Sequence, residues 1–195
     1  MAIGARLKRR RELLSSVAAG SIRKLRSHDL HRLCRHLLRL DAEDRRRRFG
    51  VSVNDDYIRG YCSHLRTRQS IVLGYFPDDE IRGSAQLSLF RNAFWSLSGE
   101  VALSVEGQLQ NRGVGTALMR RLLVISRNRG VHDIHMLCLR DNPVMQTLAK
   151  KFGADLILHT SEVEGKLCPP LLSCLSIMEE ILADSRAAFE WSRRF

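Results

Sequence analysis

The most informative segment of the chain is QNRGVG, residues 110–115, which lies between an expected strand and an amphipathic helix. Gly113 and Gly115 have no Cβ atom, so a ligand can approach the backbone closely there. A helix that begins at this turn points unpaired N–H groups and the positive end of its dipole at the loop. Arg112 adds a charge-assisted donor. The stretch predicts a phosphate or pyrophosphate site, although glycines that open a helix can also serve packing alone.

The hydrophobic pattern around this stretch alternates between strand and helix periods. We expect strands at 21–25, 71–76, 81–90, 95–105, 132–139 and, as the last one, 155–160, with the second and third forming a hairpin. We expect helices up to about residue 19, at 28–40, 55–64, from the glycine turn to about 128, at 142–152, and after Pro170. The charged segment 42–48 predicts either a turn or a short helix.

This order of elements predicts one α/β domain, with a parallel crossover joined to antiparallel strands in a mixed sheet. We expect a basic N-terminal helical extension over residues 1–19, the main domain over 20–168 and a C-terminal helix within 169–195. That helix carries an apolar stripe and is expected to pack on its own domain or to be swapped, so the chain is predicted to be a monomer or a homodimer. The stripe consists of Met178, Ile181, Leu182 and Phe189.

The glycine stretch resembles motif A of the GNAT superfamily of N-acetyltransferases, in which Gln or Arg is followed after two residues by Gly, one residue, and Gly or Ala. Gln110, Gly113 and Gly115 match this pattern, and the likeness continues through the helix start GTALM at 115–119. Further matches follow the next strand: Asp141, Asn142, Pro143, Met145, Leu148, Lys151 and Gly153.

The resemblance is strong over about residues 99–154 and looser over about 20–160. In the N-terminal half, the SHD at 27–29, the LDAEDR at 40–45, and Arg48 with Phe49 look like the opening of GNAT domains from bacterial protein-lysine acetyltransferases. The family implies a mixed, splayed sheet flanked by helices, with acetyl-CoA as cosubstrate between the two strands that part.

The resemblance also implies which residues hold the cosubstrate. The backbone of Leu103, Ser104 and Val105 would pair with the pantetheine arm, and Asn142 would contact the arm from the other side. The pyrophosphate would be held by Gln110 and by the backbone amides of the glycine turn: Asn111, Arg112, Gly113, Val114, Gly115 and Thr116. No metal is expected to take part.

Glu100 is the candidate catalytic residue. It lies on the strand that enters the motif, on the face opposite Val101, Leu103 and Val105. An amine attacks a thioester only when neutral, so a positioned carboxylate can act as general base; Glu100 resembles the strand glutamate with that role in a number of family members. It could instead pair with an arginine or anchor the substrate. The tyrosine that often protonates the leaving thiolate is replaced by Ala149.

The chain is strongly basic, with 32 Lys and Arg residues and a formal net charge of +11. Such a charge attracts anions, but no recognition helix, zinc-finger spacing or RNA-binding signature accompanies it, so nucleic acid is not the expected partner.

The five cysteines fit no metal or redox spacing, which favours a reducing cytoplasm. Trp95 and Trp191 are expected to be packing anchors. No apolar run is long enough to span a bilayer.

Three hypotheses about function remain at this point. The first is an N-acetyltransferase that moves acetyl from acetyl-CoA to a primary amine, either a protein lysine or a small amine, by direct attack in a ternary complex. The second, motivated by Ala149, is an acyl-CoA-binding regulatory or scaffold module with weak or lost catalysis. The third is a basic nucleic-acid-associated protein, whose binding would weaken steeply with salt.

Overall fold

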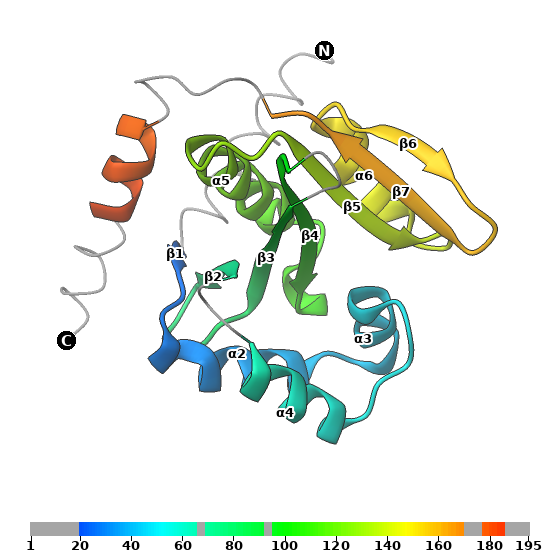
Figure 1. Cartoon of the computed structure of the whole chain (residues 1–195). Coiled ribbons are helices and arrows are strands. Elements are labelled where there is room, and N and C mark those ends of the chain that lie inside the picture. The colour runs from blue at the N-terminus through cyan, green and yellow to red at the C-terminus, as the bar shows by residue number, and fades with distance from the viewer. Residues whose placement is uncertain (1–19, 66–68, 92–94, 170–176, 186–195) are drawn as a thin grey trace, which may run out of the picture.

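The computed structural model describes residues 20–65, 69–91, 95–169 and 177–185 (Figure 1). The expected N-terminal helix over 1–19 lies outside the described residues, as do Phe189 and Trp191. The domain boundaries expected from the sequence therefore stay predictions.

A seven-stranded mixed sheet forms the centre of the described part of the chain, with the order β1-β2-β3-β4-β5-β7-β6. Only β4 and β5 are parallel; every other neighbouring pair is antiparallel. The predicted hairpin is confirmed, because Ile71 pairs with Leu87 across the second and third strands. The strands are β1 Ser21–Lys24, β2 Ser70–Phe76, β3 Gly83–Arg91, β4 Leu97–Val105, β5 Asp133–Leu139, β6 Asp155–Leu158 and β7 Glu162–Leu167.

Helices cover both faces of this sheet (Figure 1). The glycine turn opens α5, which packs on β2, β3 and β4, and α6 packs on β5, β6 and β7. On the other face α2 packs against α4, and α3 lies against β4 and β5. The helices are η1 Ser27–Asp29, α2 Leu30–Arg39, α3 Ala42–Phe49, α4 Asp55–His64, η2 Gly107–Leu109, α5 Val114–Asn128, α6 Pro143–Lys151 and a helix over 177–185.

Two apolar clusters hold these layers together, one on each face of the sheet. The α5 side includes Leu118 and Leu122, which are completely buried against Val101 of β4. The opposite side buries Leu37 of α2 and Ile58 of α4. Alternate residues of β4 therefore face different layers, as the strand period requires.

The charged segment 42–48 folds as a helix, which settles the alternative left open by the sequence. The side chain of Asp41 accepts a hydrogen bond from the Asp44 amide and caps the N-terminus of α3, and Gly50 ends the helix with φ of 76°. None of its residues is buried. The caps and ion pairs, rather than an apolar face, define α3.

Two expectations from the sequence are wrong. The strand at 155–160 is not the last one, because β7 follows it and inserts between β5 and β6. Val163, Gly165 and Leu167 of β7 do alternate as buried positions, but charged residues and a glycine dilute the apolar signal. Trp95 is not a packing anchor: its side chain is 78% exposed, with φ of 61°.

The helix over 177–185 contacts the domain through its acidic residues. Glu180 accepts hydrogen bonds from Lys24 and Asn128, and Asp184 accepts from Lys24 and Arg121. Its apolar residues Ile177, Met178, Ile181 and Leu182 point outward and are exposed. Among the described helices, none is long and apolar enough to cross a bilayer.

Candidate functional site

The parallel strands β4 and β5 part from each other at the middle of the sheet. They are paired only from Ser98 with Asp133 to Glu100 with His135. Beyond this point both strands continue, β4 to Val105 and β5 to Leu139, without pairing to each other. The expected splayed sheet is therefore confirmed, and the edge of β4 that faces β5 has backbone groups available to an extended ligand.

A cavity of about 320 Å³ lies where the strands part. Its volume falls at the lower end of the range for small-molecule sites. The walls come from β4, β5, the glycine turn, α6 and the end of α3. They include Glu100, Leu103, Ser104, Val105, Gln110, Asn111 and Gly115 among the predicted residues, and Asn142 on the opposite side.

The N-terminus of α5 points unpaired amides at this region. The first helical hydrogen bond runs from the Ala117 amide to the Gly113 carbonyl, and no side chain caps the helix. The helices α3, α4 and α6 are each capped by an Asp or Asn side chain, whereas α2, like α5, has no side-chain cap. The first turn of α5 also contains no acidic residue. The positive end of the α5 dipole is thus left uncompensated, as an anion site requires.

The loop before α5 adopts the backbone that the glycine pattern predicts. Gly113 has φ of 85°, a left-handed conformation that strains residues with a Cβ atom. Asn111 is also left-handed, with φ of 57°. Successive residues of mixed handedness turn their amides toward one side and form a concave anion site. Val114 is buried and can offer only its backbone, while Arg112 is exposed.

Lys151 adds a cation at this end that the sequence analysis did not predict. Its Nζ lies 3.2 Å from Thr116 Oγ1, in the first turn of α5. The pairing depends on how α6 packs beside α5, so only Thr116 could be placed from the local sequence.

Gln110 and Asn142 lie at opposite walls of the cavity. The Gln110 amide nitrogen donates to Asp44 (2.8 Å) and to the Val105 carbonyl (3.0 Å), which joins α3 to the end of β4. Its expected contact with a pyrophosphate stays a prediction. Asn142 Oδ1 caps α6 by accepting from the Met145 amide, which leaves its amide nitrogen able to donate into the cavity.

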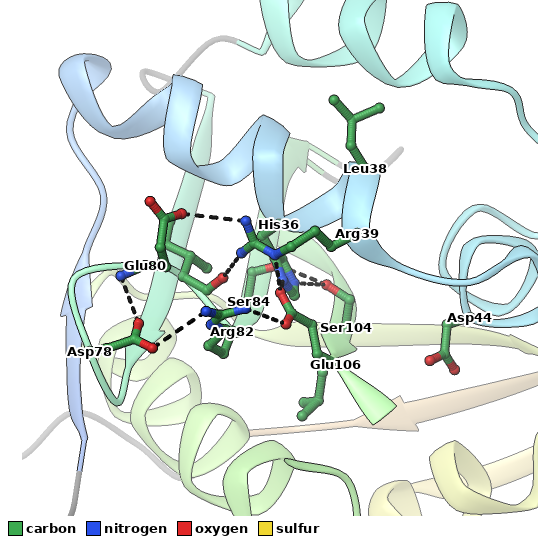
Figure 2. Close-up of polar contacts among 12 residues, drawn as sticks. His36, Leu38, Arg39, Asp44, Asp78, Glu80, Arg82, Ser84, Ser104 and Glu106 are labelled. Atoms are coloured by element: carbon green, nitrogen blue, oxygen red, sulfur yellow. Dashed lines mark hydrogen bonds and ion pairs between the residues drawn. The ribbon is translucent and has the colours of Figure 1, made fainter. Parts of the chain in front are cut away.

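The side chain of Ser104 points away from the parted strands, toward α2 (Figure 2). Its hydroxyl lies 2.9 Å from His36 Nε2 and 2.9 Å from Ser84 Oγ. His36 is completely buried, and its Nδ1 lies 3.1 Å from Glu106. Burial lowers the pKa of His36 despite this carboxylate. The neutral ring therefore donates to Glu106 through Nδ1 and accepts from Ser104 through Nε2.

Glu106 connects the end of β4 to α2 and β3 (Figure 2). Arg39 Nε donates to it at 2.9 Å and Arg82 at 3.2 Å. Burial alone would raise the pKa of Glu106, but the hydrogen bonds from His36, Arg39 and Arg82 outweigh burial and lower it to about 2. This network fixes the end of β4, whose edge toward β5 is open, and no local sequence pattern predicted it.

Among the described residues, three carboxylates line the cavity: Glu100, Asp44 and Glu162. Glu162 lies at the start of β7, opposite Leu139 at the end of β5. Glu100 is exposed at the last position of β4 that pairs with β5, and its side chain makes no ion pair or hydrogen bond with a described residue. The alternative in which it pairs with an arginine therefore has no support in the described part of the chain. Asp44 also lines the cavity, and burial raises its pKa against the hydrogen bond from Gln110.

Ala149 does not line the cavity. It is 2% exposed and packs in the core on the α5 side of the sheet. The residues of α6 that do face the cavity are Val144, Met145 and Leu148, and none of them carries an acidic proton. The described residues also contain no group of three His, Cys, Asp or Glu side chains arranged to hold a metal.

Comparison with known proteins points to one family. No curated protein sequence matches significantly. Among solved structures, the GNAT domain of S. lividans PAT has a TM-score of 0.64 and 18% identity, over 75% of this chain and 89% of that one. PaiA N-acetyltransferase from Thermoplasma acidophilum, in complex with coenzyme A, has a TM-score of 0.58 and 18% identity, over 76% and 98%. YncA from Salmonella typhimurium, with its cofactor acetyl-CoA, has a TM-score of 0.60 and 14% identity, over 80% and 96%.

These structures share the fold of this chain at low sequence identity. The sequence match is more specific, because a model of the acetyltransferase (GNAT) family covers residues 31–154. That range contains the parted strands, the glycine turn and the start of α6. The chain therefore belongs to the acetyltransferase (GNAT) family.

Proposed function

We propose that this protein transfers an acetyl group from acetyl-CoA to a primary amine by direct attack in a ternary complex. The observation that carries the proposal is the parting of β4 from β5 directly beside the uncapped N-terminus of α5. The open edge of β4 suits the extended pantetheine arm of acetyl-CoA, and the N-terminus of α5 suits its phosphates.

The residues present fit this cosubstrate. The unpaired edge of β4 at Leu103, Ser104 and Val105 offers backbone groups to the pantetheine amides, and Asn142 can donate from the α6 side. A Cβ atom built on Gly115 meets no atom within 4 Å, so the space over the first turn of α5 is open. The amides from Arg112 to Thr116 would hold the pyrophosphate, with Lys151 as a further cation. Bound there, acetyl-CoA supplies the activated acetyl group.

Glu100 is the proposed general base. A free lysine with a pKa of about 10.4 is neutral roughly once in a few thousand molecules at pH 7, a deficit of about 4 to 5 kcal/mol. As the amine nitrogen bonds to the acetyl carbon and the carbon–sulfur bond breaks, the ammonium proton passes to Glu100 directly or through one water. The thiolate then takes its proton from solvent, since a thiol is a good leaving group. Glu100 suits this role because its carboxylate forms no ion pair or hydrogen bond with a described residue.

A second candidate function is an acyl-CoA-binding module with weak catalysis. The observation that favours it is the apolar lining that α6 gives the cavity, with Ala149 buried where relatives often carry a tyrosine. The nucleic-acid hypothesis is less well supported, because Arg45 and Arg46 of the expected basic cluster are taken up in ion pairs. A cytoplasmic location, and the choice between monomer and homodimer, stay predictions from the sequence.

Steady-state release of CoA with a panel of amines and lysine peptides tests the proposal. We expect saturable turnover, and we expect Glu100→Gln to lower kcat by about 10²- to 10⁴-fold while acetyl-CoA still binds. Asp44→Asn and Glu162→Gln are the matched comparisons, because they remove the other two carboxylates that line the same cavity. A larger loss from Asp44→Asn would move the base to α3. Acetyl-CoA binding without turnover of any amine would favour the binding module.

A further inference from the structure

Arg48 differs from the other arginines of α3 because it has no carboxylate partner among the described residues. The three arginines before it each form an ion pair: Arg45 with Asp55 at 2.7 Å, Arg46 with Asp141 at 2.5 Å and Arg47 with Glu43 at 3.0 Å. Arg48 lines the cavity and forms no ion pair with any described residue. The last arginine of α3 thus brings into the cavity where β4 and β5 part a positive charge that no ion pair with a described residue holds.

The guanidinium of Arg48 is nevertheless held firmly. One terminal nitrogen donates to Tyr61 Oη and to Gln86 Oε1, both at 3.0 Å. The group also lies over the rings of Phe49, at 5.0 Å, and Tyr61, at 5.6 Å. Its Nε is buried and has no hydrogen-bond partner in the part of the chain that the structure describes. All of these partners are neutral, so they orient the cation without balancing its charge.

An oriented, half-buried cation with an unused donor is costly unless an anion meets it. Taking charge out of water is unfavourable, and a neutral acceptor recovers only part of the loss. Because one terminal nitrogen already donates to Tyr61 and Gln86 and Nε is buried, the other terminal nitrogen, Nη1, is the group that can donate to a ligand. The neutral supports hold it in place and so reduce the entropy lost on binding. These properties are typical of a site that recognises a carboxylate.

The cation lies close to the proposed base on the same face of the sheet. Gln86 is paired with Ala102 in the β3–β4 register, and Glu100 is the next residue on that face. Such diagonal neighbours have α carbons roughly 7–8 Å apart. The Gln86 amide also donates to Ser88, which is the cross-strand partner of Glu100. Arg48, which donates to Gln86, and Glu100 therefore lie near enough for one acceptor molecule to contact both side chains.

We propose that the acceptor is an amine that also bears a carboxylate, with the carboxylate bound by Arg48 and the nitrogen beside Glu100. This rests on the proposed acetyl transfer and names the class of its acceptor. Two sources share the chemistry: a free amino acid, and a lysine next to an acidic residue in a peptide. The phosphates of acetyl-CoA are a separate anion, which the amides of α5 would hold.

Acceptor binding to the CoA-saturated protein tests this directly, because it does not need turnover. Isothermal titration would compare two matched pairs: leucine with leucinamide, and acetyl-Gly-Lys-Glu-amide with acetyl-Gly-Lys-Gln-amide. We expect the carboxylate member of at least one pair to bind about tenfold or more tightly. The pair that shows the difference identifies the source. Turnover of the same compounds, measured in parallel by CoA release, should follow the same order.

Arg48→Gln should remove the preference and leave the weak binding of the carboxamides within about twofold. Arg59→Gln is the matched control, because it takes the same charge from the exposed face of α4, where Arg59 pairs with Asp56; it should keep the preference. If Arg48→Gln unfolds, the comparison of carboxylate and carboxamide ligands in the unaltered protein still tests the acceptor class.

The outcomes separate the two claims. Equal binding of both members of each pair, or no binding of either, overturns the acceptor class even if other amines are acetylated. A carboxylate preference without CoA release overturns the acetyl transfer but keeps the carboxylate site.

Discussion

Replacing Glu106 by Gln should destabilise the protein by an amount that depends on pH. The pKa of Glu106 falls from 4.5 to about 2 in the folded protein, where its side chain is 15% exposed. At 1.36 kcal/mol per pKa unit, this shift stabilises the fold by about 3 kcal/mol near neutral pH. The figure is an upper bound, since His36 is neutral there and contributes a hydrogen bond without a charge.

The direction of the pH effect follows from the lowered pKa. A carboxylate with a depressed pKa stabilises the fold above its unfolded value of 4.5, and the contribution is lost as the pH falls from there toward 2. Gln has no proton to gain. The difference between the native protein and Glu106→Gln should be about 3 kcal/mol at pH 7, nearly the same at pH 5.5, and about 1 to 1.5 kcal/mol at pH 3.

Urea unfolding followed by circular dichroism at these pH values measures the difference. Glu80→Gln is the control, because Glu80 also pairs with Arg39 but is 32% exposed; it should cost no more than about 1 kcal/mol. A loss below about 0.5 kcal/mol for Glu106→Gln at pH 7, or a difference that stays constant down to pH 3, would refute the assigned network.

Three further predictions concern other parts of the molecule. Lys151→Met should weaken acetyl-CoA binding about 3- to 10-fold and reduce its salt dependence, measured by calorimetric titration at two ionic strengths; unchanged affinity would exclude Lys151 from the phosphate site. Leu122→Ala, at a completely buried position of α5, should cost about 2 to 5 kcal/mol in urea unfolding, and a cost under about 1 kcal/mol would contradict the packing. Glu180→Gln removes a carboxylate that accepts from Lys24 and Asn128, so hydrogen exchange in the helix over 177–185 should become faster; unchanged exchange would mean that these contacts do not hold it.

The order of elements could be predicted where the sequence carries a local signal. Asp55–His64 is a helix with the bounds expected from its pattern, because Asn54 caps it and Ile58 and Cys62 are buried on one face. The glycine turn was also predictable, since Gly113 needs a left-handed backbone and α5 follows at once. β7 was missed because Glu162, Glu164 and Lys166 occupy its outward positions and Gly165 weakens its inward face.

The acceptor side of the cavity could not be predicted, because it is formed by segments far apart in the chain. Arg48 meets Gln86 of β3 and Tyr61 of α4, and nothing in the local sequence of α3 distinguishes Arg48 from Arg47. The same holds for His36, whose histidine-rich helix gave no reason to expect a buried contact with Ser104. A phosphate site at a helix end is formed by consecutive residues and can be predicted from the local sequence. Contacts between side chains of different layers depend on the whole fold.

A thermal-shift titration with acetyl-CoA, with Gly115→Asp as the negative variant, shows whether acetyl-CoA binds at the N-terminus of α5. A Cβ atom at Gly115 meets nothing within 4 Å, and a carboxylate in the first turn of a helix favours the helix while it repels phosphate. Gly60→Asp is the matched control, since a Cβ atom there also meets nothing within 4 Å.

At a hundred times the dissociation constant, acetyl-CoA should add about 2.7 kcal/mol of stability, or roughly 5 to 10 °C in Tm for a chain of this size. We expect this saturable shift in the native protein and in Gly60→Asp, and its loss in Gly115→Asp. No shift in the native protein, or an equal shift in Gly115→Asp, would contradict an acetyl-CoA site at the N-terminus of α5.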